Sequence, residues 1–331
     1  NSSLNYKHKK LSLLPKDSLQ IEVDNEFIID EVSGFFYDDE IIDRYTVKSK
    51  RNIYQLDLEG GILRREKLAS EGPKGIKTVS DFDGVGILEN GSIIYSNHFL
   101  NRIEKLDKEK IQTIYEINEE NANERLHSSW FSPVINTDRY ILFPKFGNWR
   151  TQLTDLSCFV LLDKESLLTK DVIKYPLKYE DYHWGDHPYL YWANIQYIKA
   201  IGKYYVSFPI ENYVRIYDQN FNYVGKKLVR SHKIEQVAPM FNEKIGKEEE
   251  PDHIKDRAYF KSLSFYIGAL YDPIHRIYYR IALIAEGNEL NEIEYSYSFV
   301  VCDYDLNYIG EWEVPQYYKV NLSFKIGRAH V

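Results

Sequence analysis

The sequence has few cysteines, no excess of basic residues and no long apolar run, and each absence excludes a class of protein. Cys158 and Cys302 are the only cysteines in 331 residues, too few for a disulfide framework or a cysteine zinc site. Both lie in apolar segments, which predicts buried thiols. Lys and Arg number 42 against 50 Asp and Glu, and the resulting net charge of −8 excludes a general nucleic-acid-binding surface. No apolar run is long enough to cross a bilayer, and no signal peptide is visible.

Several catalytic and nucleotide-binding motifs are also absent. The sequence has no Gly-x-Gly-x-x-Gly fingerprint, no phosphate-binding glycine loop, no Gly-x-Ser-x-Gly nucleophile turn and no repeated Asp box of the sialidase type. A hydrolase triad can be written from Ser128, His127 and Asp186, but nothing in the sequence supports its geometry. A metal-dependent propeller lactonase would need Glu, Asn and Asp side chains that converge on a divalent ion. Candidates for such a set include Glu211, Asn212 and Asn194.

What the sequence does contain is a large supply of core residues in a repeated pattern. Hydrophobic residues make up 44% of the chain and aromatic residues 15%, enough for a sizeable core. A short apolar run that ends in Asp and is followed by a turn and a second β-rich run occurs five times. The two most similar copies are Tyr217–Gly225 and Cys302–Gly310. The repeat length of about 50 residues, with four strand-like segments in each copy, is typical of β-propeller blades.

The pattern predicts an all-β fold, a six-bladed β-propeller of four-stranded antiparallel blades with an incomplete last blade. Five blades fall at residues 34–68, 79–117, 131–177, 192–229 and 263–314. The aspartate that closes each third strand is expected to cap a hairpin turn through its carboxylate, rather than to bind metal. The spacing between the closing aspartates of the fourth and fifth blades is longer than the others, and a loop insertion at 230–261 explains it. A degenerate blade hidden there would raise the count to seven.

Both ends of the chain carry further expectations. Residues 19–24 form an isolated alternating strand and residues 320–325 resemble the first strand of a further blade, so the two segments are expected to share a sixth blade. The chain starts at Asn1 rather than Met, and we expect that an N-terminal piece has been removed or lost. The codon string ATC-GGA-AGA-GCA-CAC-GTC, which occurs in a widely used sequencing adapter, would encode residues 326–331, so this tail is expected to be non-native.

The connections predict which face of the propeller is functional. Turns within the first and third hairpins are short, whereas the connections that emerge on the opposite face are long and chemically rich. These long connections are Asn118–Ser129, Lys145–Ser157, Lys178–Tyr191, Arg230–Lys261 and Glu286–Glu294. Loop length can also drift without function, so this face is a hypothesis for the binding site.

Three segments of that face supply the candidate ligand-binding residues. The segment 182–188 has two histidines four residues apart, but Gly185 and Pro188 disfavour the helix that would turn both imidazoles to a metal. Trp149 beside Arg150 suits stacking on sugar rings or gripping a carboxylate, although the indole could equally fill a gap between blades. In the third segment, residues 127–130, His127 is expected to face the funnel and Trp130 to pack between sheets. The candidate residues are His127, Trp149, Arg150, Tyr182, His183, Trp184, Asp186 and His187.

The chain resembles an uncharacterised family of TolB-like six-bladed β-propellers, mostly lipoproteins, from Bacteroidetes. The resemblance rests on Glu71-Gly72-Pro73-Lys74-Gly75 after the first blade, on the repeated apolar-Asp hairpins and on the high tyrosine content. Related propellers often have Gly-Pro-Gly where this chain has Gly-Pro-Lys-Gly. The resemblance implies an exported protein, periplasmic or anchored to the outer membrane by a lipid N-terminal to Asn1. It implies no known activity.

These observations predict a non-enzymatic binding module of the bacterial cell envelope. An aromatic-lined funnel would hold a glycan, a peptide or an envelope protein, and no cofactor, nucleic-acid partner or transmembrane segment is expected. The alternative is a metal-dependent hydrolase or lactonase that uses the same funnel, for which an ion with ligands from three or more blades would be the evidence. A purely structural subunit would instead expose an apolar patch on the outer strands.

Overall fold

The structure is a computed structural model of the chain. It describes residues 34–37, 44–49, 51–57, 62–72, 75–76, 78–80, 82–107, 110–117, 124–129, 132–147, 153–241, 252–273, 275–287 and 293–314. The predicted shared strands at 19–24 and 320–325, the tail at 326–331, and Trp149 with Arg150 lie outside these residues.

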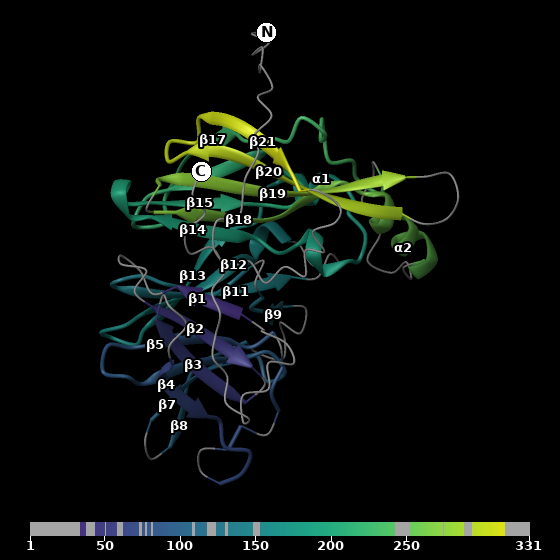
Figure 1. Ribbon diagram of the computed structural model, residues 1–331. Coiled ribbons are helices and arrows are strands. Elements are labelled where there is room, and N and C mark those ends of the chain that lie inside the picture. Colours follow the sequence, from purple (N-terminus) through teal and green to yellow (C-terminus); the bar gives the residue numbers. More distant parts are fainter. Residues whose placement is uncertain are drawn as a thin grey trace.

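Strands dominate the molecule and form five antiparallel sheets, so the all-β class is confirmed (Figure 1). Each sheet follows the order of its strands along the chain. The first sheet contains β1 (Gly34–Tyr37), β2 (Arg44–Ser49), β3 (Asn52–Asp57) and β4 (Ile62–Lys67). The second contains β5 (Gly84–Ile87), β6 (Ile93–Asn97), β7 (Arg102–Leu106) and β8 (Ile111–Glu116). The third contains β10 (Ile135–Asn136), β11 (Tyr140–Gly147), β12 (Ser157–Asp163) and β13 (Thr169–Lys174), and the short β9 (Glu124–Leu126) pairs with β11.

The remaining two sheets have the same plan. The fourth contains β14 (Asn194–Ile198), β15 (Lys203–Ser207), β16 (Tyr213–Tyr217) and β17 (Tyr223–Leu228). The fifth contains β18 (Phe265–Asp272), β19 (Ile277–Gly287), β20 (Ile293–Asp303) and β21 (Tyr308–Glu313). The connections between sheets carry α1 (Lys178–Asp181), η3 (Pro188–Leu190) and α2 (His253–Ser262), and η2 (Leu153–Asp155) and η4 (Lys199–Ile201) lie in connections within sheets. No helix among the described residues has the length and hydropathy of a membrane span.

Consecutive sheets approach one another through their first strands. Strand β5 contacts β1 and β10, and β14 contacts β10 and β18, so the first strands form an inner series and the last strands lie outside. Burial follows this order, because β5 and β6 are buried along their whole length whereas β4 alternates between exposed and half-buried residues. The core therefore lies between the sheets, on their inner strands.

Three of the five repeated aspartates cap their third hairpins, as predicted. The Oδ1 atom of Asp163 accepts the N–H groups of Glu165 and Ser166 at 3.1 and 3.0 Å. Asp218 and Asp303 have identical roles, each accepting the N–H groups two and four residues further on. Because the partners are local, the same sequence pattern gives the same turn in three different sheets.

The predicted buried thiols are also confirmed. Cys158 and Cys302 are both free and buried. Burial raises the pKa of Cys158 well above its usual range and that of Cys302 to about 12. Both therefore remain protonated thiols that pack as small apolar groups.

Two segments differ from their predicted structure. The insertion, predicted as a loop, contains the ten-residue helix α2, which begins after Asp252 because this side chain caps the N–H groups of Ile254 and Lys255. The predicted loop at 286–294 is shorter, because β19 and β20 continue to Gly287 and from Ile293. This long hairpin extends beyond the rest of its sheet and α2 lies beside it (Figure 1).

A buried arginine joins the fourth and fifth sheets. Arg280 of β19 is fully buried and its guanidinium stacks 3.6 Å from the ring centroid of Tyr266. Its nitrogens donate to the Ser207 hydroxyl at 2.9 Å and to the Val229 carbonyl at 2.6 Å. Two further donations go to the carbonyls of Phe208 and Glu211. Every nitrogen of this buried cation therefore has a partner.

Candidate functional site

A continuous row of aromatic and imidazole rings crosses the connections between consecutive sheets. We call it the aromatic row, and its members are Phe82, His127, Trp192, Tyr189, His187 and Phe260. The centre of the row is a stack in which His127 lies between Phe82 and Trp192, with ring centroids 4.2 and 4.1 Å apart. Tyr189 continues it at 4.5 Å from Trp192. At the far end His187 stacks on Phe260 at 3.4 Å with nearly parallel planes.

The positions of these residues in the chain explain why the row is continuous. Phe82 and Trp192 lie two residues before the first strands β5 and β14, and His127 directly follows β9 in the connection that leads to β10. The strands β5, β10 and β14 are neighbours in the inner series. Tyr189 belongs to the same connection as Trp192, and Phe260 is supplied by α2 from the connection that leads to β18. The first strands thus bring together rings that are distant in sequence.

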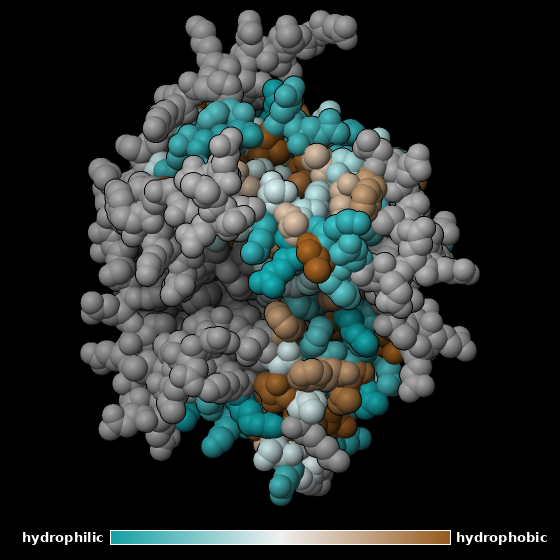
Figure 2. Space-filling view, turned by 90° about the vertical axis from the view of Figure 1, so that its right-hand side faces the viewer, coloured by the Kyte–Doolittle hydropathy of each residue, from teal (hydrophilic) through white to brown (hydrophobic). Residues whose placement is uncertain are grey.

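Part of the aromatic row faces solvent. Phe82 is 40% exposed and Tyr189 36% exposed, while Trp192 and His127 are buried behind them. Phe99 and Leu100, in the turn between β6 and β7, add further exposed apolar surface next to His98, whose ring lies 5.4 Å from Phe82. Figure 2 shows the side of the molecule that carries α2 and β9, and apolar side chains gather there among hydrophilic ones. The row can therefore offer flat apolar faces to a ligand.

His127 is a buried imidazole without a hydrogen bond. Both of its nitrogens and the indole nitrogen of Trp192 are buried and have no partner among the residues that the structure describes. Burial, together with the neighbouring His98, lowers the pKa of His127 well below its usual range. The ring is consequently neutral at physiological pH, with one N–H donor and one nitrogen acceptor unused.

The remaining candidates of the segment 182–188 separate into core and surface residues. Trp184 is 1% exposed, and its indole donates to the Lys178 carbonyl at 3.2 Å. His183 is buried, stacks on Phe241 and pairs with its backbone. Tyr182 is half-buried and packs edge-on to Trp184. The structure therefore places Trp184 and His183 in the core and Tyr182 half-buried beside them.

Asp186 and His187 stay at the surface but face different partners. Burial against Phe260 lowers the pKa of His187 to about 4. The two histidines of the segment do not meet, because His183 contacts Phe241 and His187 contacts α2. Gly185 between them has φ +75°, which breaks any helical spacing, as the sequence predicted.

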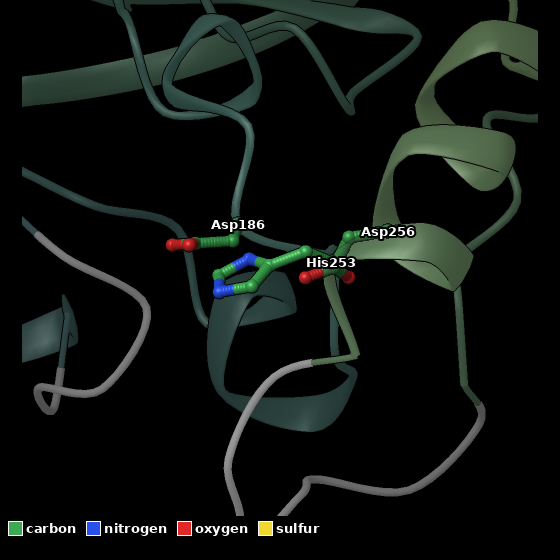
Figure 3. Close-up of side chains that lie close together, drawn as sticks. All are labelled: Asp186, His253 and Asp256. Atoms are coloured by element: carbon green, nitrogen blue, oxygen red, sulfur yellow. The ribbon is translucent and has the colours of Figure 1, made fainter.

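Asp186 instead meets two side chains of α2. One ligand atom each from Asp186, His253 and Asp256 lie within 4.8 Å of one another. His253 and Asp256 project from the first turn of α2, and the imidazole lies between the two aspartates in Figure 3. Carboxylate oxygens with an imidazole nitrogen form a donor set suited to Zn²⁺ or a similar divalent ion.

The charges in this cluster oppose one another. Partial burial raises the pKa of Asp256, and the negative charge of Asp186 raises it further, while His253 acts in the opposite direction. One carboxylate oxygen of Asp256, Oδ2, is buried without a hydrogen-bond partner. A cation or a donor group would relieve both the repulsion and the unpaired oxygen.

The candidate residues for a hydrolase do not form the interactions that such a site needs. The Ser128 hydroxyl and both nitrogens of His127 lack hydrogen bonds, so the two residues do not form a Ser–His pair. Glu211 holds Arg215 through two bonds of 2.8 Å. Asn212 donates to the Glu235 carbonyl and accepts the Tyr266 hydroxyl. These groups stabilise the fourth sheet and its connections.

The family assignment rests on the greater part of the chain. Residues 10–313 match the domain of unknown function DUF4221. The chain belongs to this family. A DUF4221 crystal structure from Bacteroides vulgatus matches with a TM-score of 0.70 and 16% identity, over 93% of this chain and 88% of that one, which shows a shared fold.

Two more distant structures are similar to this DUF4221 chain. One is a Bacteroides fragilis protein whose name describes it as exported, with a TM-score of 0.48 and 10% identity over 90% of this chain and 74% of that one. The other is a calcium-binding regucalcin from Agrobacterium tumefaciens, with a TM-score of 0.45 and 11% identity over 85% and 74%. No curated protein matches the chain.

Sequence reasoning missed most of the site of this DUF4221 protein. Of the aromatic row it named only His127 and His187, and of the metal-compatible cluster only Asp186. The Pro188-Tyr189 pair beside Trp192 was a usable signal, because Pro188 starts a 3₁₀ turn that fixes both rings. His253 and Asp256 gave no signal, because their spacing has meaning only on a helix.

Proposed function

We propose that this protein is a non-enzymatic ligand-binding propeller of the bacterial cell envelope. The observation that carries the proposal is the aromatic row, in which six rings from four consecutive connections are contiguous and two of them, Phe82 and Tyr189, are exposed. Aromatic faces with few polar groups between them are typical of sites that bind by shape and stacking.

The finer architecture belongs to the same proposal. A TolB-like propeller of six blades would consist of the five sheets and a sixth blade shared by residues 19–24 and 320–325. The inner series of first strands supports a propeller, because blades meet at the axis through these strands. Residues 230–261 would then be a decoration of the binding face, because they contribute Phe260 to the aromatic row.

The proposed location is outside the cytoplasm. The resemblance to Bacteroidetes lipoproteins supports export to the periplasm or anchoring to the outer membrane by a lipid N-terminal to Asn1. Labelling of the full-length protein with a palmitate analogue in its native host tests the anchor. Absence of label from the membrane fraction would refute it.

Substitution of the exposed members of the aromatic row, Phe82 and Tyr189, tests the binding function. The full chain is screened against neutral oligosaccharides, acidic oligosaccharides and peptides, and hits are measured by isothermal titration calorimetry. The double variant Phe82→Ala/Tyr189→Ala should lose binding, because it removes the two exposed rings. Tyr223→Ala is the matched control, since Tyr223 is also exposed but lies on the outer strand β17. No binding by the wild type, or equal binding by the double variant, would refute the proposal.

The second candidate function is a metal-dependent hydrolase, and the cluster of Asp186, His253 and Asp256 favours it. A bound divalent ion there would polarise a carbonyl or activate water at one end of the aromatic row. The metal-binding side chains come from only two connections between sheets, whereas a metal site on the propeller axis would take its side chains from three or more blades.

Metal titration separates the two functions. Zn²⁺, Mn²⁺ and Ca²⁺ are titrated into chelator-treated protein, with elemental analysis and hydrolysis of ester and lactone substrates as readouts. His253→Ala and Asp256→Asn should abolish binding and turnover together, and Asp138→Asn should change neither because this carboxylate lies on an exposed turn beside Lys199. If the protein binds a ligand but neither binds metal nor hydrolyses a substrate, the binding function is supported and the hydrolase function is refuted.

A further inference from the structure

The unpaired polar atoms of the aromatic row define what its ligand must offer. Both nitrogens of His127 and the indole nitrogen of Trp192 are buried without partners, and their rings stack at 4.1 Å. Other buried polar atoms of the described residues also lack partners, such as the Tyr279 hydroxyl, but those three belong to two neighbouring rings. Buried polar groups normally have hydrogen bonds, so such a concentration indicates an interaction that the described residues do not supply.

The chemistry of these atoms selects a hydroxyl group. A neutral imidazole has one donor and one acceptor, and the indole adds a second donor. A carboxylate would satisfy the two donors and leave the imidazole acceptor unpaired. An ammonium group would satisfy only the acceptor. A hydroxyl both donates and accepts, and two adjacent hydroxyls can satisfy the whole set.

The surroundings of His127 add an apolar requirement and a route of access. Phe82 covers one face of the imidazole, Trp192 the other, and the edge-on rings of His98 and Phe146 lie 5.2 and 5.3 Å away. Phe82 is the exposed member of the stack, so a ligand approaches His127 from the side of this ring. A ligand in this place therefore needs flat apolar faces as well as hydroxyl groups.

We infer that the aromatic row binds a neutral carbohydrate, with its C–H faces on Phe82 and Tyr189 and adjacent hydroxyl groups hydrogen-bonded by His127 and Trp192. This inference rests on the proposed binding function and narrows its ligand class. Peptides and acidic oligosaccharides become the competing outcomes of the test.

The test uses variants that keep an aromatic ring at each position and remove the nitrogens. Neutral oligosaccharides that bind the full chain are measured by calorimetry against His127→Phe and Trp192→Phe. Each variant should bind about tenfold more weakly, because each loses hydrogen bonds while the stack remains. Tyr279→Phe is the matched control, since it also removes a buried unpartnered polar group but on β19. It should bind with wild-type affinity.

Thermal unfolding accompanies each titration. Both variants should remain folded, His127→Phe with a melting temperature at or slightly above that of the wild type and Trp192→Phe with a slightly lower one because its side chain is smaller. Weaker binding by a variant that is still folded cannot be attributed to a disrupted fold. Unchanged carbohydrate affinity in both variants overturns the inference. Binding of peptides or acidic oligosaccharides alone also overturns it and leaves the proposed function intact. Absence of any ligand removes both.

Discussion

Two buried regions of this molecule treat their polar atoms in opposite ways. At the junction of the fourth and fifth sheets, Arg280 is fully buried and each of its guanidinium nitrogens has a partner. In the aromatic row, His127 is almost equally buried and neither of its nitrogens has one. Both groups join neighbouring sheets, so position in the fold does not explain the difference.

The difference separates groups that stabilise the fold from groups that remain available for a ligand. A buried cation with complete hydrogen bonding contributes to stability and has nothing left to offer. A buried neutral imidazole without partners contributes only its packing, at the cost of its desolvated nitrogens. Variants at the two regions should therefore change different properties of the molecule.

The largest effect is expected at Arg280. Arg280→Met keeps an unbranched apolar chain but leaves the Ser207 hydroxyl and three carbonyl groups without donors. The free energy of unfolding, measured with urea, should fall by about 3 to 5 kcal/mol. Arg125→Met, on the exposed side of β9, is the control and should change it little. A loss below about 1 kcal/mol at Arg280 would mean that the junction is not a stabilising centre.

Glu311 is a second buried charged group whose hydrogen bonds are complete, and its contribution to stability should depend on pH. Burial alone would raise its pKa, but hydrogen bonds from Ser231, Ser298 and His232 outweigh burial and hold the pKa below its ordinary value. A lowered pKa in the folded state means stability that is present at neutral pH and is lost as the pH falls through that pKa. Glu311→Gln should therefore cost about 2 kcal/mol at pH 7 and progressively less in acid.

Urea unfolding between pH 3 and pH 8 measures this cost. Glu313→Gln is the matched control, since Glu313 lies two residues further along β21 and is more exposed. A cost at Glu311 that does not change with pH would show that its ionised form is not favoured by folding.

The same distinction explains what could be predicted from the sequence. The aspartates of the third hairpins were predicted correctly because their partners lie within four residues, and apolar alternation predicted the all-β class for a similar reason. The aromatic row could not be predicted, because Phe82, His127 and Trp192 meet only through the packing of three first strands. Trp184 shows the reverse failure, since an aromatic residue in a loop has the same local pattern whether its ring is buried or exposed.

A smaller effect is expected where α2 rests on the connection before η3. Gly185 has φ +75°, and a Cβ atom there would lie 3.3 Å from the Tyr259 ring and 3.4 Å from the Asp256 carboxylate. Gly185→Ala should cost about 1 kcal/mol in unfolding free energy and weaken any divalent-ion binding by Asp186 and α2. Gly225→Ala, with open space around it, is the control. Unchanged stability in Gly185→Ala would mean that α2 moves away without loss.

The smallest change in stability at neutral pH is expected at His127, where the substitution should stabilise the protein rather than destabilise it. His127→Phe keeps the stack and removes the unpartnered nitrogens, so the variant should be more stable than the wild type by about 0.5 kcal/mol at pH 7. Because the pKa of His127 is lowered in the folded state, the unfolded chain binds more protons below the ordinary histidine pKa, and the wild type loses stability as the pH falls.

Burial also lowers the pKa of the neighbouring His98. Its protonation in the unfolded chain therefore lowers the stability of the wild type and of His127→Phe alike as the pH falls. The difference in unfolding free energy between His127→Phe and the wild type should therefore grow below about pH 6.5, by about 1 kcal/mol per pH unit, because only the wild type retains both histidines. Urea unfolding from pH 5 to pH 8 measures it. An advantage that stays constant would show that His127 is protonated equally in both states. The aromatic row would then lack the neutral donor and acceptor that distinguish it from the saturated junction at Arg280.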